Sequence, residues 1–313
     1  MAKKRLLTGV QPSGSLHIGN YIGALRPFVE MYEQYDSMLM VADYHALTTI
    51  KNPEELRRNT LDMVKDYLAA GVDPEHALIF RQSDIQEHTE LAWIFDCLVS
   101  VPFLMQAHAY KDKVSKGLEA SAGLFTYPML MAADILLYDT DIVPVGSDQR
   151  QHIEYAREAA IKFNNTFGKI FTEPTERIIE KEASVPGTDG KKMSKSYGNT
   201  IPLFGSRDDI TKAVMSIVTD STGKSPKNVY AIHMHFRTRE QLADIYKKNE
   251  GNYKALKEML IEDIERVVAP MRSKRDTIRD DDVKRVISKG AEAARERART
   301  KMKMVREKIG INL

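Results

Sequence analysis

The sequence predicts an α/β fold: a parallel sheet covered by helices, with a helical insertion, followed by an all-helical C-terminal domain. Short apolar runs alternate with helical patterns through the first 80 residues, as they do when helices connect parallel strands. Residues 86–140 are mainly helical in pattern, and no strong strand candidate follows residue 206. The sheet is therefore expected in the first two thirds of the chain.

Four short apolar runs supply the predicted strands, which are residues 5–10, 37–42, 77–80 and 142–146. The first run is followed by a turn at 11–15 and by a helical pattern from about 18 to 35. Pro53 begins the next helix and Gly71 ends it, because proline suits a first helical turn and glycine a helix end. Another helix is expected from about 148 to 163.

A stretch rich in glycine and proline, residues 184–206, predicts mobile loops. Helical patterns fill the chain after it, so we place a domain boundary near Phe204. The predicted domains are residues 1–204, with the helical insertion at about 86–140, and residues 205–313.

Length and composition are those of a soluble enzyme with a well-buried core. The chain has 313 residues, 42% of them hydrophobic and 29% charged, which suffices for two domains. Cys97 is the only cysteine, so a disulfide within the chain and a Cys-rich zinc or iron–sulfur site are excluded. No apolar run is long enough to span a membrane, and no signal-peptide core follows the basic start. We expect a cytoplasmic protein with no membrane partner.

Charge is unevenly distributed along the chain. The formal net charge is +2, but residues 271–313 carry +7 and the remainder carries −5. This asymmetry suggests an anionic partner at the C-terminal end. Charge alone, however, favours a solvated helix with a basic face.

The segment from Gln11 to Asn20 has the features of a nucleotide-binding turn. It joins a predicted strand to a predicted helix, whose start presents backbone N–H groups and the positive end of the helix dipole. Gly19 lets a ring or ribose approach the backbone, and His17 can donate to a phosphate whose charge grows in the transition state. Gln11 and Ser13 offer further polar contacts. A lone histidine would be incidental here, but the whole segment after the first strand favours ATP binding.

The second segment, Lys192-Met193-Ser194-Lys195-Ser196, places two lysines and two hydroxyls in a loop. A lysine-rich surface loop is usually only solvated. Here glycines at 187, 190 and 198 flank the loop and permit it to close. Two cations within reach of one phosphate chain can offset the charge that develops on leaving pyrophosphate. Together the two segments predict adenylyl transfer.

The two segments resemble the H-I-G-H and K-M-S-K-S signatures of class I aminoacyl-tRNA synthetases, with Asn20 in the last position of the first. Further stretches resemble the bacterial tryptophanyl-tRNA synthetases, namely residues 9–14, 19–24, 131–136 and 145–149. The similarity covers about residues 5–313 and is clearest before residue 200. It implies a Rossmann-type catalytic domain at 1–204 and a helical anticodon-binding domain at 205–313.

The resemblance also implies roles at the ATP site. It assigns catalysis to Gln11, His17, Lys113, Lys192 and Lys195. The residues that bind ATP would be Gln11, Pro12, Ser13, Gly19, Asn20, Gly146, Ser147, Asp148, Val185, Lys192, Met193, Ser194, Lys195 and Ser196. Mg²⁺ would accompany ATP, held by phosphates and water rather than by a visible set of protein ligands. With Cys97 alone, the iron–sulfur cluster of some relatives is excluded.

Asp134 is the centre of the predicted amino-acid pocket. An indole has one N–H donor and a large apolar face, so its pocket needs one buried acceptor among apolar walls. Asp134 lies in an apolar helical stretch, where a carboxylate needs a partner; a structural role is the usual interpretation of a lone aspartate there. By resemblance it accepts the indole N–H. The other residues assigned to tryptophan are Leu7, His45, Tyr127, Met131, Val143, Val145 and Gln149.

Two alternatives stay open. A tyrosyl-tRNA synthetase shares the fold and the stretch 146–149, but it is expected to carry tyrosine where this chain has Leu7 and a different lysine-loop signature. Residues 131–134 favour tryptophan. The other alternative is a synthetase-like paralogue that binds RNA without catalysis, against which the intact motifs argue.

The resemblance implies L-tryptophan, ATP, tRNA(Trp) and a second copy of the chain as partners. The helices at 86–140 are the candidate homodimer interface, and the basic C-terminal end fits contact with tRNA phosphates. The chain departs from a familiar bacterial form at Leu7, where that form has phenylalanine. It also continues after the lysine loop with residues 197–202, Tyr-Gly-Asn-Thr-Ile-Pro, in place of Asp-Pro.

Overall fold

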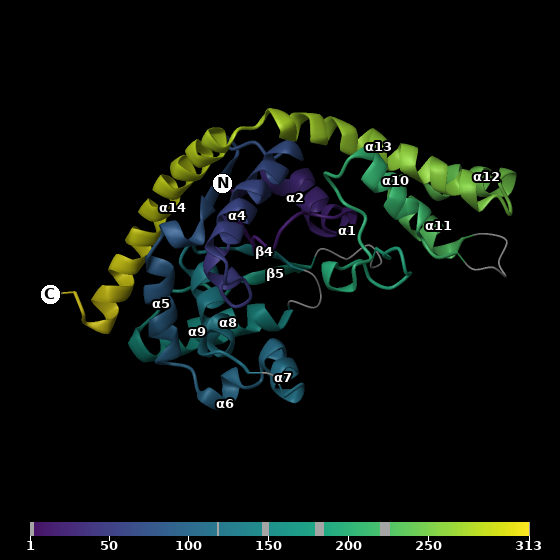
Figure 1. Cartoon of the computed structure of the whole chain (residues 1–313). Helices are drawn as coiled ribbons and strands as arrows, with labels where there is room; N and C mark the ends of the chain where they lie inside the picture. The colour runs from purple at the N-terminus through teal and green to yellow at the C-terminus, as the bar shows by residue number, and fades with distance from the viewer. Residues whose placement is uncertain (1–2, 118, 146–149, 179–184, 220–225, 313) are drawn as a thin grey trace.

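A computed structural model describes residues 3–117, 119–145, 150–178, 185–219 and 226–312 of the chain (Figure 1). Within these ranges the α/β class is confirmed: helices cover a parallel sheet, and the chain after residue 206 is helical. The described helices include none that is long and apolar enough to cross a membrane.

The sheet has five parallel strands in the order β3-β2-β1-β4-β5. Their bounds are β1 (Arg5–Val10), β2 (Asp36–Val41), β3 (Ala77–Arg81), β4 (Ile142–Val145) and β5 (Thr175–Ile178). The first four confirm the predicted strands, whereas β5 was not predicted. The strand order reverses between β1 and β4, and in open α/β sheets ligands bind outside the carboxyl ends of the strands at such a point.

Strands β1 to β4 form at mainly apolar runs of the sequence, because both faces of a parallel sheet are covered. Leu6 and Leu7 of β1 are both buried, although they point to opposite faces. The register pairs Leu6 with Ser37 and Leu7 with Met38 of β2, and Leu6 also with Ile142 of β4. This packing fixes the point at which β1 ends and the first motif begins.

The helix predicted from 18 to 35 is divided into shorter elements. These are α1 (Ile18–Asn20), a π-helical turn η1 (Tyr21–Leu25), α2 (Arg26–Met31) and the 3-10 turn η2 (Tyr32–Gln34). The division has a local cause: Pro27 has no N–H to donate, and Arg26 N–H bonds the carbonyl of Tyr21, five residues back. The next helix, α4 (Pro53–Ala69), begins and ends as predicted.

The insertion between β3 and β4 is helical, as predicted. It contains α5 (Glu87–Asp96), α6 (Val101–Leu104), α7 (His108–Ser115) and α8 (Ala122–Leu136). After β4 comes α9 (Arg150–Phe167), close to the predicted bounds. Helices α8 and α9 lie against each other below the sheet in Figure 1.

The C-terminal part consists of α10 (Arg207–Met215), α11 (Lys227–His233), α12 (Arg239–Lys248), α13 (Tyr253–Thr277) and α14 (Asp280–Ile309). Figure 1 shows α13 beside α10 to α12, whereas α14 turns back along the sheet and α5. Gly290 permits this approach, because a Cβ there would overlap the backbone oxygen of Ile79 in β3.

Two hydrophobic clusters join the parts of the chain on either side of Phe204. One includes Phe80 of β3 and Met302 of α14. The other includes Val64 of α4 and Ile264 of α13. The domain division at 204 therefore stays a prediction about function, since the apolar packing is continuous across it.

Candidate active site

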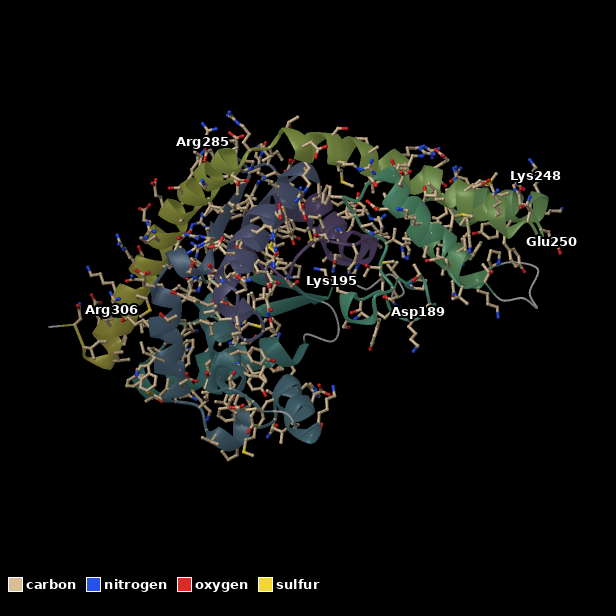
Figure 2. The ribbon with its side chains drawn as sticks, viewed as in Figure 1. Asp189, Lys195, Lys248, Glu250, Arg285 and Arg306 are labelled. Atoms are coloured by element: carbon tan, nitrogen blue, oxygen red, sulfur yellow. The ribbon has the colours of Figure 1, made fainter. Side chains whose placement is uncertain are left out.

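The two predicted motifs meet at the carboxyl edge of the sheet, where the strand order reverses. The first motif directly follows β1 and leads into α1. Pro202 forms an antiparallel bridge with His17, and Ile201 accepts the N–H of Ile18 at 2.9 Å. Figure 2 shows Lys195 beside this N-terminal segment. Backbone pairing thus holds the chain after the lysine loop against the first motif.

His17 is the N-cap of α1 and is buried. Its Nδ1 accepts the N–H of Asn20 at 3.2 Å, and Asn20 Oδ1 accepts the N–H of His17 at 3.1 Å. Since Nδ1 is the acceptor, the ring proton is on Nε2. Burial, and then the charge of Lys195, lower the pKa of His17 to about 4. His17 is therefore a neutral donor at pH 7, which suits the role predicted from the sequence.

Met193 anchors the lysine loop on the first motif. Its side chain is buried, and its Sδ accepts the N–H of Gly19 at 3.3 Å. Its own N–H bonds the carbonyl of Val185 at 2.9 Å. A Cβ at Gly19 would lie 3.0 Å from the His17 ring and 3.3 Å from Met193 Cβ. The glycine thus admits the loop and the ring, in addition to the predicted approach of ATP.

Lys195 reaches the first motif with its ammonium group, which donates to the carbonyl of Ser13 at 2.8 Å. Burial lowers the pKa of Lys195, and the negative charge of Asp66 in α4 opposes that effect. Burial also raises the pKa of Asp66 to about 6, although Arg275 Nε bonds its Oδ1 at 2.5 Å. Lys192 and Ser196 are exposed.

Asp134 of α8 is buried, and both its oxygens are engaged. Gln82 Nε2 donates to them at 2.8 and 2.9 Å. His45 Nε2 lies 3.0 Å from Oδ2, and His88 Nδ1 lies 2.7 Å from Oδ1. Burial disfavours the charged carboxylate, but the His88 and His45 rings together outweigh burial and lower the pKa of Asp134 to about 2. The group is an ionised acceptor at neutral pH.

The partners of Asp134 come from the carboxyl ends of neighbouring strands. His45 lies in α3 (Asp43–Ala46), which follows β2. Gln82 begins the 3-10 turn η3 (Gln82–Asp84), which follows β3. His45 was predicted from the sequence, whereas Gln82 and His88 were not. Gln82 had a usable signal, because it comes two residues after the predicted strand 77–80, whose neighbour leads to His45.

The residues predicted to form the apolar walls lie near α8, and their contact with tryptophan stays a prediction. Leu7 and Val143 are buried in the hydrophobic cluster that includes neighbours of Asp134 on α8, and Met131 packs against it. The ring of Tyr127 is half-buried and lies edge-on to His45, with centroids 6.2 Å apart. Gly146, Ser147, Asp148 and Gln149 lie outside the described residues, as do the side chains of Lys113 and Val145.

The remaining predicted ATP residues lie within the two motifs, except Val185. Gln11 and Ser13 are exposed, Pro12 is buried, and Asn20 is half-buried. Ser194 and Ser196 bond each other through their hydroxyls at 2.9 Å. Val185 is buried beside Met193, so its side chain is a core residue in addition to its predicted contact with adenine. The described residues contain no group of three or more ligands suited to a metal ion.

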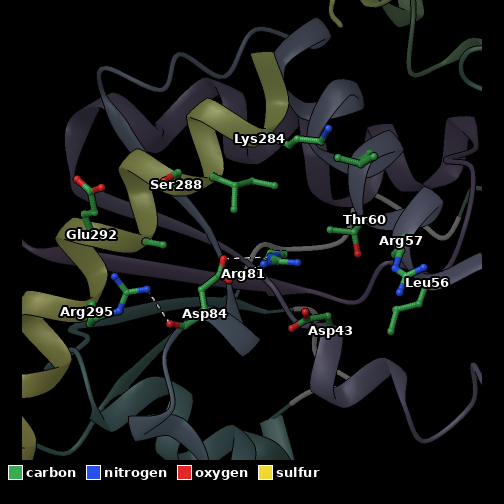
Figure 3. Close-up of a pocket in the computed structure, with 13 residues that line it drawn as sticks. Asp43, Leu56, Arg57, Thr60, Arg81, Asp84, Lys284, Ser288, Glu292 and Arg295 are labelled. Atoms are coloured by element: carbon green, nitrogen blue, oxygen red, sulfur yellow. Dashed lines mark hydrogen bonds and ion pairs between the residues drawn. The ribbon is translucent and has the colours of Figure 1, made fainter. Parts of the chain in front are cut away.

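A separate cavity of about 570 Å³ lies between α4, the end of β3 and α14 (Figure 3). Asp84 on its wall is bonded by Arg81, and the Asp84 carbonyl accepts from Arg295 at 3.0 Å. Asp43, also on the wall, accepts the N–H of Ser83 at 3.0 Å. The cavity thus adjoins the turn that carries Gln82, but none of the predicted site residues lines it.

Fold and site together define the class of protein. Residues 2–280 match the family of tRNA synthetases class I (W and Y), and the chain belongs to this family. Its architecture agrees with that family: a histidine motif follows β1 of the parallel sheet, and the lysine loop lies against this motif.

Relatives in this family point to tryptophan. The chain is 44% identical over 319 residues to the tryptophan–tRNA ligase of Fusobacterium nucleatum subsp. nucleatum, with 98% of each chain covered. The crystal structure of tryptophanyl-tRNA synthetase from Campylobacter jejuni complexed with ADP and tryptophan has a TM-score of 0.91 at 43% identity, covering 98% of this chain and 99% of that one. The Mycoplasma pneumoniae synthetase has a TM-score of 0.83 at 29% identity and 98% coverage of both chains. These similarities place the chain among the tryptophan–tRNA ligases.

Proposed function

We propose that the protein activates L-tryptophan with MgATP to form tryptophanyl-adenylate and transfers the aminoacyl group to the 3′ end of tRNA(Trp). One observation carries the proposal. The lysine loop docks on the histidine motif at the reversal point of the sheet, through Gly19 to Met193 and Lys195 to Ser13. Cations, a neutral N–H donor and a buried carboxylate then occupy one edge of the sheet.

The first step needs charge stabilisation rather than acid–base catalysis. A tryptophan carboxylate oxygen attacks the α-phosphorus, and the bond to the bridging oxygen of pyrophosphate breaks. Negative charge grows on the phosphates, where Lys192, Lys195 and the Nε2–H of His17 are proposed to act. Mg²⁺ enters with ATP. The other ATP contacts expected from the sequence, including Lys113, Gln11 and residues 146–148, remain part of this proposal.

Asp134 is proposed to select tryptophan by accepting the indole N–H. Because both carboxylate oxygens already hold donors, the indole must displace or share one of them. His45 is the candidate to move, since it neighbours Tyr127, another residue proposed to line the pocket. A phenol both donates and accepts at its tip and so needs a donor/acceptor pair there, whereas an indole needs one acceptor; the pocket is proposed to discriminate on this difference.

The helical residues 205–313 are proposed to contact tRNA, and their role in anticodon binding rests on the resemblance. We also propose a homodimer in the cytoplasm. The insertion exposes large apolar side chains, among them Trp93 of α5, which is 70% exposed, and Val101 of α6, which is 59% exposed. A second copy of the chain would cover them.

Pyrophosphate exchange into ATP tests the proposal. We expect exchange that depends on L-tryptophan and not on L-tyrosine. Asp134→Asn should lower kcat/KM for tryptophan by about 100-fold or more while the KM for ATP stays within about threefold, because an amide there offers one acceptor among several donors. Exchange with tyrosine alone would overturn the substrate assignment, and no exchange with either amino acid would favour a noncatalytic RNA-binding protein.

A further inference from the structure

Asn199 is a buried polar residue beside the lysine loop. Only 2% of its surface is exposed, although it follows four exposed residues, 195–198. Burying a carboxamide is unfavourable unless its oxygen and its NH₂ group find hydrogen-bond partners. The contacts of Asn199 therefore show what holds this part of the chain in place.

The carboxamide of Asn199 bonds the loop backbone on both sides of Met193. Its Oδ1 accepts the N–H of Ser194 at 2.8 Å. Its Nδ2 donates to the carbonyl of Lys192 at 3.1 Å and to Asp189 Oδ1 at 2.7 Å. The orientation of the amide is determined by these partners, because the oxygen faces a donor and the nitrogen faces two acceptors.

The chain before the loop is fitted to Asn199 as well. The N–H of Thr188 bonds the carbonyl of Asn199 at 2.9 Å. Gly187 lies so close that a Cβ there would overlap the Asn199 side chain. The hydrogen bond from Asn199, followed by one from the N–H of Lys191, lowers the pKa of Asp189 and keeps its carboxylate ionised as the acceptor. Residues 187–194 are thus held by Asn199, through its side chain and its backbone carbonyl.

These contacts fix the backbone positions from which the side chains of the two loop lysines extend. Asn199 holds the carbonyl of Lys192 and the N–H of Ser194, the residue before Lys195. Met193 between them is held by the N–H of Gly19. The three side-chain hydrogen bonds of Asn199 described above are to backbone groups and to Asp189, and none of them is to a lysine ammonium. Any effect of Asn199 on the phosphates must therefore pass through the loop backbone.

We propose that Asn199 is a positioning residue for adenylate formation: its carboxamide sets the loop backbone from which Lys192 and Lys195 reach the triphosphate. The inference rests on the proposed function, which assigns these lysines to the phosphates. A displacement of about 1 Å at a reacting group can cost about 100-fold in rate, so loss of the carboxamide should appear in kcat.

The test compares Asn199→Ala with Asn164→Ala in the full-length protein. Asn164 of α9 is a matched control, because its side chain also makes three hydrogen bonds, in this case all to backbone groups: its Oδ1 accepts from Ile170 and Phe171, and its Nδ2 donates to Phe171. We expect Asn199→Ala to lower kcat of ATP–pyrophosphate exchange by about 10- to 100-fold, with the KM for tryptophan within about threefold. Asn164→Ala should reduce thermal stability and leave kcat within about threefold.

Equal kcat values in the two variants would overturn the proposal. If Asn199→Ala does not fold, Asp189→Ala decides, because it removes one partner of the carboxamide at an exposed residue. We then expect kcat to fall at least threefold, and an unchanged kcat overturns the proposal. Lys195→Ala distinguishes a failure of the proposed function from a failure of this inference. If Lys195→Ala exchanges pyrophosphate at the normal rate, the proposed role of the lysine is wrong, and the inference about Asn199 is wrong with it. If Lys195→Ala is slow but Asn199→Ala is normal, only the proposed role of Asn199 is wrong.

Discussion

His17 shows at the residue scale how local bonding selects a chemical role. Its Nδ1 caps α1, so the proton must be on Nε2, and burial keeps the ring neutral. A cationic histidine would add charge to a site that already has Lys195. A neutral donor instead supplies a hydrogen bond that strengthens as phosphate charge grows. Because burial lowers the pKa of His17, it also makes the free energy of unfolding depend on pH.

His17→Asn should change how stability depends on pH. The ring titrates near 6.5 in the unfolded chain and at about 4 in the folded protein, so the native state binds fewer protons between these values. Its stabilising contribution is fully present above pH 6.5 and is lost as the pH falls through 4. Asparagine can still cap α1 through Oδ1 but does not titrate.

Urea unfolding of both proteins between pH 7 and pH 4 measures this effect. We expect the difference in free energy of unfolding between the wild type and His17→Asn to change by about 2 kcal/mol, against the wild type, as the pH falls from 7 to 4. Subtracting the variant removes the opposite contribution of Asp66, whose pKa is raised to about 6. Parallel profiles for the two proteins would contradict the assignment of a buried neutral ring.

At the scale of elements, the return of α14 to the sheet is a feature that the sequence did not predict. Its small residues Gly290, Ala291, Ala294 and Ala298 are buried, and they let the helix lie close to β3. Basic residues near the C-terminal end pair with acids from the first 140 residues. These pairs are Arg275–Asp66, Lys289–Glu75, Arg297–Asp36, Arg299–Glu87, Lys301–Asp139 and Arg306–Glu90. Part of the excess positive charge at the C-terminal end is therefore paired with carboxylates of the same chain.

Gly290→Ala should destabilise the protein by forcing α14 away from β3. The added Cβ would overlap the backbone of Ile79, which cannot rotate away as a side chain could. We expect the free energy of unfolding to fall by about 2 to 3 kcal/mol, as for overpacked cores. Chemical denaturation provides the measurement.

Gly123→Ala is the matched control for this substitution. Gly123 lies in α8, and a Cβ there meets no atom within 4 Å. Alanine should stabilise that helix by up to about 1 kcal/mol, because it is the better helix former. Equal changes in both variants would show that helix propensity, and not the contact between α14 and β3, sets the stability.

At the scale of the whole molecule, the exposed apolar residues of the insertion form the surface proposed for the homodimer interface. Trp93, Val101 and Met105 are 70%, 59% and 49% exposed in α5, α6 and the residue after α6. These exposed apolar side chains fit coverage by a second copy, as the resemblance predicts.

Trp93→Glu should shift the protein from dimer to monomer. A carboxylate at the centre of an apolar interface would lose its hydration on association, so the dimer should weaken by at least about 100-fold. Sedimentation velocity across a concentration series measures the change. Met259→Glu is the control, because Met259 is 36% exposed on α13, which does not belong to the insertion. A wild-type monomer, or equal dissociation of both variants, would contradict this interface.

Much of the fold could be predicted because its signals are local. The apolar runs of β1 to β4, the proline start of α4 and the glycine after it confirm the predictions. Strand β5 was missed because Thr175-Glu176-Arg177 is polar and the strand lies at the edge of the sheet. Gln82 and His88 were missed because their roles depend on Asp134, which is 52 and 46 positions away along the chain.

The sequence by itself determined the class, the two motifs and the central carboxylate, because periodicity and contiguous motifs are local properties of the chain. Only the tertiary structure decided that the lysine loop rests on Gly19 and Ser13, and that Asn199 fastens it. It also decided that α14 returns to the sheet. The physical reason is common to these cases: each is a contact between distant segments, and its stability comes from burial and hydrogen bonds that exist only once the chain has folded.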